Sequence, residues 1–245
     1  MKRMYQPGKN SLESKSYFRT VIGDLKTCWN DVKLLYSSCI RWQLKQWLVV
    51  LSVIIGLAAA LVLDQTLRTE AAALHGRIQD MIFIFGHWYG QGTATLYLFL
   101  LCYVVGLILH RDRFRSTGVL IGESYLFSGI IVTALKSILG RWRPSTNHGS
   151  FAFLPFTAGP NDHLSFPSGH VAVAFALSSI MAGLHHKKFW KIFWYALATL
   201  TALSRIYHDE HWLSDVFFST VIGIGVGKWL IDNAYTSHKE HSNAE

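Results

Sequence analysis

Three polar clusters interrupt the apolar second half of the 245-residue chain, and their residue types suit chemistry on a phosphate group. The first occupies residues 136–144, the second is the tetrapeptide 167–170, and the third occupies residues 204–215. Together they hold cations that can bind phosphoryl oxygens, histidines that can attack phosphorus or move a proton, and a carboxylate that can orient a histidine. The sequence therefore predicts a phosphate site whose nucleophile is a protein side chain.

The first cluster contains Lys136 and Arg143, which are seven residues, or about two helical turns, apart. If the helix that carries Lys136 continues to Pro144, both side chains point the same way and the proline then ends the helix. Lys136 supplies a compact point charge, whereas Arg143 and Arg205 present planar forks that match phosphate oxygens. One such arginine alone would favour simple anchoring at the membrane surface, but three converging cations favour anion binding.

The second cluster, Pro167-Ser168-Gly169-His170, lies where a proline-rich loop gives way to an apolar segment. Backbone N–H groups at Ser168 and Gly169 could face an anion at the positive end of the helix that begins there. Gly169 would allow close approach, Ser168 offers a hydroxyl, and His170 would face the same anion from one turn in. Ordinary helix capping is the alternative for the tetrapeptide taken alone.

The third cluster places His211 four residues before Asp215, hence on one face of a helix. The carboxylate could accept a hydrogen bond from Nδ1–H and leave Nε2 free to attack, although an ordinary pair at the membrane surface is the alternative. A metal site built from residues 208–211 is disfavoured, because successive residues of one loop cannot easily converge on an ion. We therefore expect no metal and no cofactor.

The elements that carry these clusters are predicted to be membrane helices. The composition is 51% hydrophobic and only 16% charged, which is typical of a membrane protein. Six apolar segments approach or reach the ~20 residues that cross a bilayer, and they occupy residues 47–63, 93–109, 118–139, 169–184, 189–203 and 212–231. Asp64 bounds the first of these segments. Residues 65–92 are half-apolar and too charged to cross, and a helix on the outer membrane surface is expected there.

The fold class expected is therefore all-α, a six-helix transmembrane bundle preceded by an amphipathic interfacial helix within residues 14–46. That helix could lie on the anionic cytoplasmic leaflet, pair with a second copy as a homodimer, or pack on its own domain. We expect an N-terminal cytoplasmic segment at residues 1–46, the six-span domain at 47–231 and a polar cytoplasmic tail at 232–245.

The basic residues predict the orientation of the chain in the membrane. Nine of the 23 lysines and arginines lie in the first 45 residues, and the even-numbered connections are consistently the more basic. The positive-inside rule then places both termini in the cytoplasm and all three polar clusters on the outer face. The net charge of +8 does not indicate nucleic acid, because nothing in the sequence resembles a base-reading module.

The three clusters resemble, residue for residue, the Lys-x6-Arg-Pro, Pro-Ser-Gly-His and Ser-Arg-x5-His-x3-Asp signature of the type 2 phosphatidic acid phosphatase superfamily, over about eighty residues. The resemblance implies a six-helix membrane bundle and a mechanism without a metal. It implies that His211 attacks phosphorus, that Asp215 orients it, and that His170 protonates the leaving oxygen and then activates water. The residues that it assigns to the phosphoryl oxygens are Lys136, Arg143, Ser168, Gly169 and Arg205.

The function expected from these residues is an integral membrane phosphatase that removes a terminal phosphate from a lipid in the outer leaflet, through a phosphohistidine. Undecaprenyl pyrophosphate, phosphatidylglycerophosphate, phosphatidate and lipid A all present such a group, so the sequence leaves the lipid open. Transfer of the phosphate to a second lipid would need the same groups, and a non-catalytic transporter or scaffold is a remote alternative. A compact chain with short loops favours a bacterial inner membrane.

Overall fold

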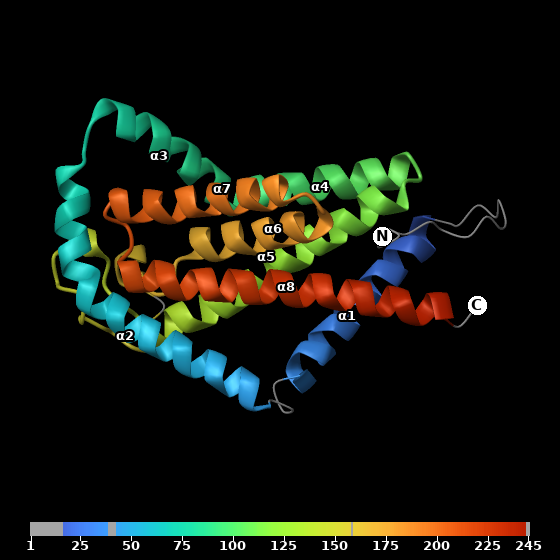
Figure 1. The fold of residues 1–245 in the computed structure, drawn as a ribbon, viewed down its shortest axis with the longest axis horizontal. Coiled ribbons are helices and arrows are strands. Elements are labelled where there is room, and N and C mark those ends of the chain that lie inside the picture. The colour runs from blue at the N-terminus through green and yellow to red at the C-terminus, as the bar shows by residue number, and fades with distance from the viewer. Residues whose placement is uncertain (1–16, 39–42, 158, 244–245) are drawn as a thin grey trace.

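The computed structural model describes residues 17–38, 43–157 and 159–243, and their regular structure is helical apart from one isolated bridge between Arg141 and Phe153 (Figure 1). The all-α class is thereby confirmed. Two short 3-10 helices lie in the loop after the fifth α-helix, at Pro144–Thr146 and Asn161–His163. The α-helices of the described residues are α1 (Tyr17–Ser38), α2 (Leu44–Ala73), α3 (Arg77–Gly90), α4 (Gly92–Ile108), α5 (Asp112–Leu139), α6 (Gly169–Leu184), α7 (Lys188–Tyr207) and α8 (Leu213–Asn243).

Helix α6 forms the centre of the molecule, and it packs against α5, α7 and α8 (Figure 1). Its side chains are buried on nearly every side, as expected for a short helix that is apolar all round. Helix α8 approaches α6 closely because Gly223 has no side chain at the contact, where a Cβ would overlap the carbonyl oxygen of Ala172. The start of α6 therefore lies beside the part of α8 around Gly223.

In the part of the chain that the structure describes, three helices are long and apolar enough to cross a membrane, namely α2, α5 and the Leu213–Ala234 part of α8. Helices α3 and α4 meet at a bend of 53° and together would make a fourth span, and α6 is a shorter apolar helix. The apolar side chains of α2 are largely exposed, as a surface in contact with lipid requires. The chain is thus an integral membrane protein, whereas six separate spans stay a prediction.

One predicted helix end is wrong. Helix α2 does not stop at Asp64 but continues to Ala73, because the Asp64 side chain is buried against polar partners instead of facing water. Helix α5 ends at Leu139, as the predicted segment 118–139 does, since Gly140 adopts a left-handed φ of 58°. The condition under which one helix would carry both Lys136 and Arg143, its continuation to Pro144, is therefore not met. A Cβ at Gly140 would overlap the carbonyl oxygen of Leu154, so the turn requires glycine.

The segment 65–92, expected as one helix on the membrane surface, is divided between the end of α2 and α3. Helix α3 packs directly on α7, where Gly86 lies against the backbone of Leu200. The predicted tail at 232–245 is also helical as far as Asn243, since α8 continues through it.

Helix α1 contacts the rest of the protein through its acidic edge. Asp24 forms an ion pair with Arg115 and accepts a hydrogen bond from Tyr103 at 3.0 Å. The apolar stripe of α1 is not buried by this contact, because the exposed fractions of Leu25 and Trp29 are 65% and 61%. The N-terminal residues 1–16 and the connection 39–42, which the prediction for this segment also covered, lie outside the described residues.

Candidate active site

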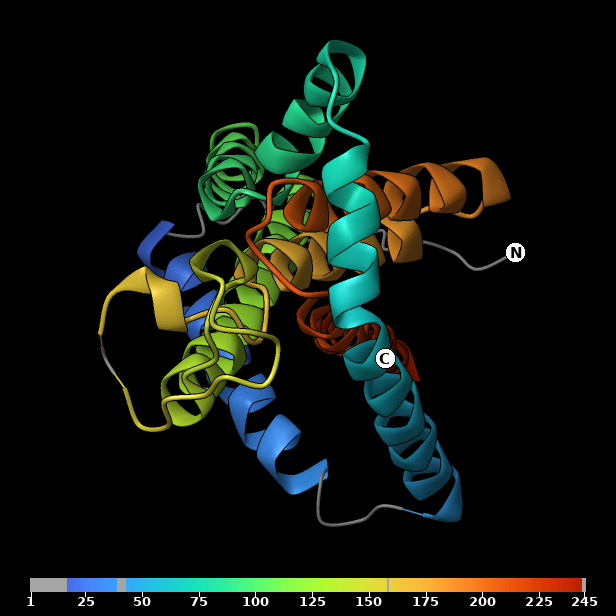
Figure 2. The same ribbon diagram turned by 90° about the vertical axis from the view of Figure 1, so that its left-hand side faces the viewer.

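The three polar clusters meet at one end of the helix bundle. The end of α5, the loop 140–168, the start of α6 and the turn between α7 and α8 all lie at the left of Figure 1, and Figure 2 faces this end. His170 on α6 lies close enough to Lys136, Arg205 and His211 to interact with them electrostatically. Arg143 interacts in the same way with Arg205 and His211. The convergence predicted from the sequence is therefore present.

His211 and Asp215 lie against each other in the buried turn that opens α8. The Nδ1 atom of His211 is 3.5 Å from Oδ2 of Asp215, a long contact of the kind that often tightens when substrate binds. The same carboxylate oxygen accepts hydrogen bonds from the hydroxyl of Ser165 and, at 2.9 Å, from the backbone N–H of Trp212. These donors hold the carboxylate beside the imidazole of His211.

The environment keeps the imidazole of His211 neutral. Its pKa is lowered to about 4, first by burial and then by the positive charges of Lys136 and Arg143, while Asp215 opposes the shift. A neutral imidazole retains the lone pair that a nucleophile needs.

Three polar atoms at this end are buried without a hydrogen-bond partner among the described residues: the hydroxyl oxygen of Ser168, Nε of Arg205 and Nδ1 of His163. The first two belong to the predicted site. A buried donor that is left unpaired costs on the order of 1–3 kcal/mol. An anion that accepts a hydrogen bond from such a donor would remove this cost, and a phosphoryl group is an acceptor of this kind.

Gly169 and His170 follow Ser168 in the first turn of α6. A Cβ at Gly169 would meet only Val132, at an ordinary 3.8 Å, so packing within the protein does not require glycine there. The backbone N–H groups of this turn form the positive end of α6.

The two cations of the first cluster are held by the loop that follows α5. The amino group of Lys136 donates to the carbonyl oxygen of Leu164, and Nε of Arg143 donates to that of Asn161 at 2.8 Å. Arg143 also forms an ion pair with Glu210, a carboxylate that competes with any anion for this guanidinium. Arg143 reaches the site from a loop and not from a continued helix, so tertiary packing brings its side chain near Lys136.

The predicted metal alternative at residues 208–211 is not formed. These side chains turn to separate partners: Asp209 pairs with Arg68, Glu210 with Arg143, and the ring of His208 lies 2.7 Å from the carbonyl oxygen of Ser204. Across residues 17–38, 43–157 and 159–243, no group of three or more His, Cys, Asp or Glu side chains is arranged to hold a metal ion.

Comparison with known proteins identifies the family of the chain. The model of the PAP2 superfamily matches residues 117–239, half of the chain and all three clusters. This chain belongs to the PAP2 superfamily. The lipid A 1-phosphatase of Porphyromonas gingivalis is 29% identical to this PAP2 protein over 131 residues, which cover 50% of this chain and 26% of that protein. The lipid A 1-phosphatase of Rhizobium johnstonii is 33% identical over 107 residues, which cover 43% of this chain and 41% of that one.

The crystal structure of Aquifex aeolicus LpxE has a similar fold, with a TM-score of 0.54 and 22% identity over 69% of this chain and 95% of that chain. At this identity the likeness shows the fold alone. The matched stretches span less than half the length of the two lipid A phosphatases named above.

Sequence reasoning missed His87 on α3 of this PAP2 protein. Its Nδ1 accepts a hydrogen bond from Arg205 at 2.9 Å, and its ring stacks on that of His170 at 5.6 Å between centroids. Gln91 lies 3.0 Å from the other ring nitrogen of His87. No signal in the sequence pointed to this residue, because it lies in a half-apolar helix far from the three clusters.

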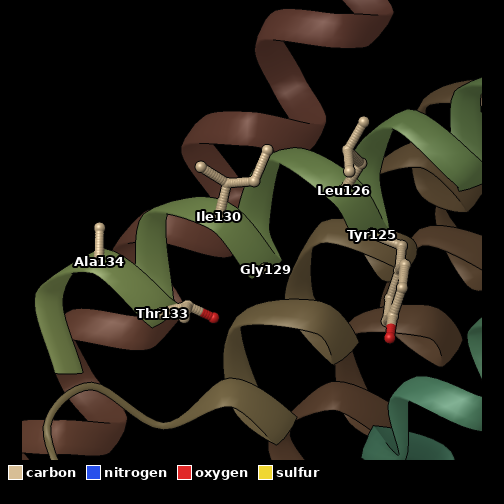
Figure 3. A pocket seen from close by; sticks show the side chains of 6 residues that line it. All are labelled: Tyr125, Leu126, Gly129, Ile130, Thr133 and Ala134. Carbon is tan, nitrogen blue, oxygen red and sulfur yellow. The ribbon is translucent and has the colours of Figure 1, made fainter. Parts of the chain in front are cut away.

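An open depression of about 480 Å³ lies along α5, and it contains none of the predicted site residues (Figure 3). Its lining is formed by Tyr125, Leu126, Gly129, Ile130, Thr133 and Ala134. No charged group lines it, so it is not a site for phosphate chemistry.

Proposed function

We propose that this PAP2 protein is a lipid phosphatase that removes a terminal phosphate through a phosphohistidine at His211. Asp215 orients the imidazole and stabilises the positive charge that the ring acquires on attack. His170 donates a proton to the leaving oxygen. The groups proposed to hold the phosphoryl oxygens are Lys136, Arg143, Ser168, Gly169 and Arg205.

In the first step, Nε2 of His211 forms a bond to phosphorus while the bond from phosphorus to the lipid oxygen breaks. The lipid oxygen takes a proton from His170 and leaves as a hydroxyl, or as a phosphate if the substrate is a pyrophosphate. In the second step, a water molecule loses a proton to His170 and attacks phosphorus, and the bond to His211 breaks. The products are the lipid and inorganic phosphate, and both histidines regain their starting protonation states.

The observation that carries this proposal is the pair of unpartnered buried donors, Ser168 Oγ and Arg205 Nε, at the same end as the oriented His211. Stabilisation of the phosphoryl oxygens is most of the catalytic work in phosphoryl transfer. A binding protein would explain the donors but not the histidine held by a buried carboxylate. The side chains that would supply charge and nucleophile are all present, so the proposed mechanism uses no metal.

The proposed substrate is lipid A or a related lipid phosphate, supported by the names of the two relatives that act on lipid A. These relatives are bacterial, which agrees with the bacterial inner membrane that we propose for this protein. The excess of basic residues before α2 supports cytoplasmic termini and an active site on the outer face.

We further propose that the exposed stripe of α1, with Leu25 and Trp29, lies on the cytoplasmic leaflet. Three exposed cations, Arg19, Lys26 and Lys33, flank the stripe and suit anionic headgroups. Pairing with a second copy is the competing arrangement. A single cysteine introduced at Leu25 in a cysteine-free variant would form a disulfide dimer in membranes only if the stripe pairs.

The test of the phosphatase proposal is phosphate release by the purified full chain in detergent with EDTA. The substrates are lipid A, undecaprenyl pyrophosphate, phosphatidylglycerophosphate and phosphatidate. We expect release from at least one lipid, and an acid-labile, base-stable phosphoprotein when a labelled substrate is quenched. His211→Ala should abolish both, whereas His186→Ala, an exposed histidine in the connection between α6 and α7, should retain them.

Activity that survives in His211→Ala would refute the phosphohistidine, and loss of activity on adding EDTA would refute the metal-free mechanism. If no lipid releases phosphate, mixtures of donor and acceptor lipids would be assayed for transfer. Transfer without release would replace the phosphatase by a phosphotransferase.

A further inference from the structure

The Arg141 guanidinium bridges two buried carboxylates, one on α2 and one on α8. Its Nη2 donates to Oδ2 of Asp64 at 2.7 Å, and its Nη1 donates to Oδ1 of Asp215. Nε and Nη2 also donate to the carbonyl oxygen of Ser150, at 2.9 and 2.6 Å. All three charged side chains are at most 1% exposed. The catalytic carboxylate is thus one end of a buried chain of charges.

Asp64 fixes the other end of this chain of charges. Its Oδ1 accepts the backbone N–H of Ser214 at 2.8 Å, and its Oδ2 accepts the Ser214 hydroxyl at 2.7 Å. Ser214 is in the first turn of α8, beside Asp215, so the Asp64 carboxylate caps this helix from a different helix. Asp64 thereby ties α2 to the turn that carries the proposed nucleophile.

The charges in the network are unequal in number. Arg141 alone would cancel the charge of Asp215, and a neutral pair would do little to stabilise the imidazolium that forms when His211 attacks. Asp64 supplies a second negative charge to Arg141, so the three side chains together carry one net negative charge. In a buried site this difference is poorly screened.

We propose that Asp64 and Arg141 are positioning residues that hold the Asp215 carboxylate toward His211 and leave one net negative charge facing that histidine. Asp64 lies outside both the three clusters and the stretch 117–239 that matches the family. This inference rests on the proposed function, in that the charge matters for catalysis only if His211 is the nucleophile.

The variant that tests the network is Asp64→Asn, because it removes the charge and keeps the size of the side chain. Its single amide oxygen can accept one of the two hydrogen bonds from Ser214, while the NH₂ group takes the place of the other acceptor. Replacing Arg141 would strand two buried carboxylates and risk unfolding the protein. We expect Asp64→Asn to lower kcat about 10-fold, within the range of coupling inside one ion-pair network. The KM should change less than about twofold, because Asp64 reaches the substrate only through other residues.

A merely structural role of Asp64 is distinguished by a double-mutant cycle with Asp215→Asn. If Asp64 acts through Asp215, adding Asp64→Asn to Asp215→Asn lowers kcat by less than about twofold further. If it only stabilises the fold, the two losses multiply, and the proposal is overturned. The control is Asp24→Asn, which removes an equivalent charge from the Asp24–Arg115 pair and should leave kcat unchanged.

A second measurement does not depend on activity. In the 15N-histidine NMR spectrum of the folded protein, the Nδ1 proton of His211 should be shifted downfield by the charged carboxylate, and Asp64→Asn should move it upfield. An unchanged resonance would refute the network even in an active enzyme. The two proposals can fail separately. If Asp64→Asn moves the resonance upfield but the wild-type protein releases no phosphate, the proposed function is refuted and the positioning role stays in place.

Discussion

Replacing Asp215 by asparagine is the sharpest perturbation of the proposed mechanism, because every partner of this carboxylate is a donor. Arg141 donates to Oδ1, while Ser165, the Trp212 backbone and His211 surround Oδ2. An asparagine has one oxygen and one NH₂ group, so one side of it must face donors. With the NH₂ toward Arg141, two donors confront each other in a buried site. With the NH₂ toward His211, the imidazole must accept through Nδ1 and carry its proton on Nε2, where it cannot attack.

The size of the effect follows from this wrong tautomer. The equivalent asparagine in the Ser-His-Asp triad of another enzyme class costs about 10⁴-fold in kcat. Here the 3.5 Å separation of His211 and Asp215 is longer than an ordinary hydrogen bond, which favours a smaller loss. We therefore expect kcat to fall by roughly 10²- to 10⁴-fold, or about 3–5 kcal/mol of barrier.

The assay is steady-state phosphate release in detergent micelles with the best lipid of the panel, fitted separately for kcat and KM. The matched control is Asp80→Asn, an exposed aspartate at the same end that accepts one hydrogen bond from Tyr207. It should stay within about threefold of wild type, as for surface changes in general. A kcat for Asp215→Asn within tenfold of wild type, or a change confined to KM, would refute the orienting role.

Three further predictions concern single groups of the site. Ser168→Ala should lower kcat/KM by about tenfold, the value of one hydrogen bond to a charged group. The melting temperature should not fall, since Oγ has no partner among the described residues. A large loss of thermal stability would contradict this prediction. Glu210→Gln frees Arg143 from an ion pair and should strengthen inhibition by inorganic phosphate about two- to fivefold. The effect is small because water partly screens this pair. Weaker inhibition would show that Glu210 does not compete with phosphate. Because the pKa of His211 is lowered to about 4, its ring gains a proton and loses the free lone pair only as pH falls through that value. 15N NMR should therefore show a neutral ring from pH 8 to pH 5. A titration near 6.5 would show that the site is more hydrated than the structure indicates.

The sequence predicted the chemistry because the residues within each of the three clusters are close together along the chain. A separation of four residues puts His211 and Asp215 on one helix face. Ser168 and Gly169 lie at the start of a helix, directly after Pro167. Long apolar segments likewise predicted the helices, since a bilayer leaves few other ways to satisfy the backbone. One predicted helix end failed where a buried contact replaced water, at Asp64. The apolar segment 118–139 ended correctly, but the sequence did not show that the left-handed Gly140 would keep the helix from reaching Pro144.

Only the tertiary structure decided which distant side chains support this chemistry. In the sequence, Asp64 bounds an apolar segment, His87 lies within the half-apolar segment 65–92, and Arg141 is not one of the signature residues. Each acquires a partner in the site from a different helix, at a separation of tens of residues along the chain. Periodicity shows which face of a helix is apolar, but not which helix it meets. The contacts that hold and charge the catalytic carboxylate depend on that meeting, because a buried ion pair exists only where packing brings its two halves together.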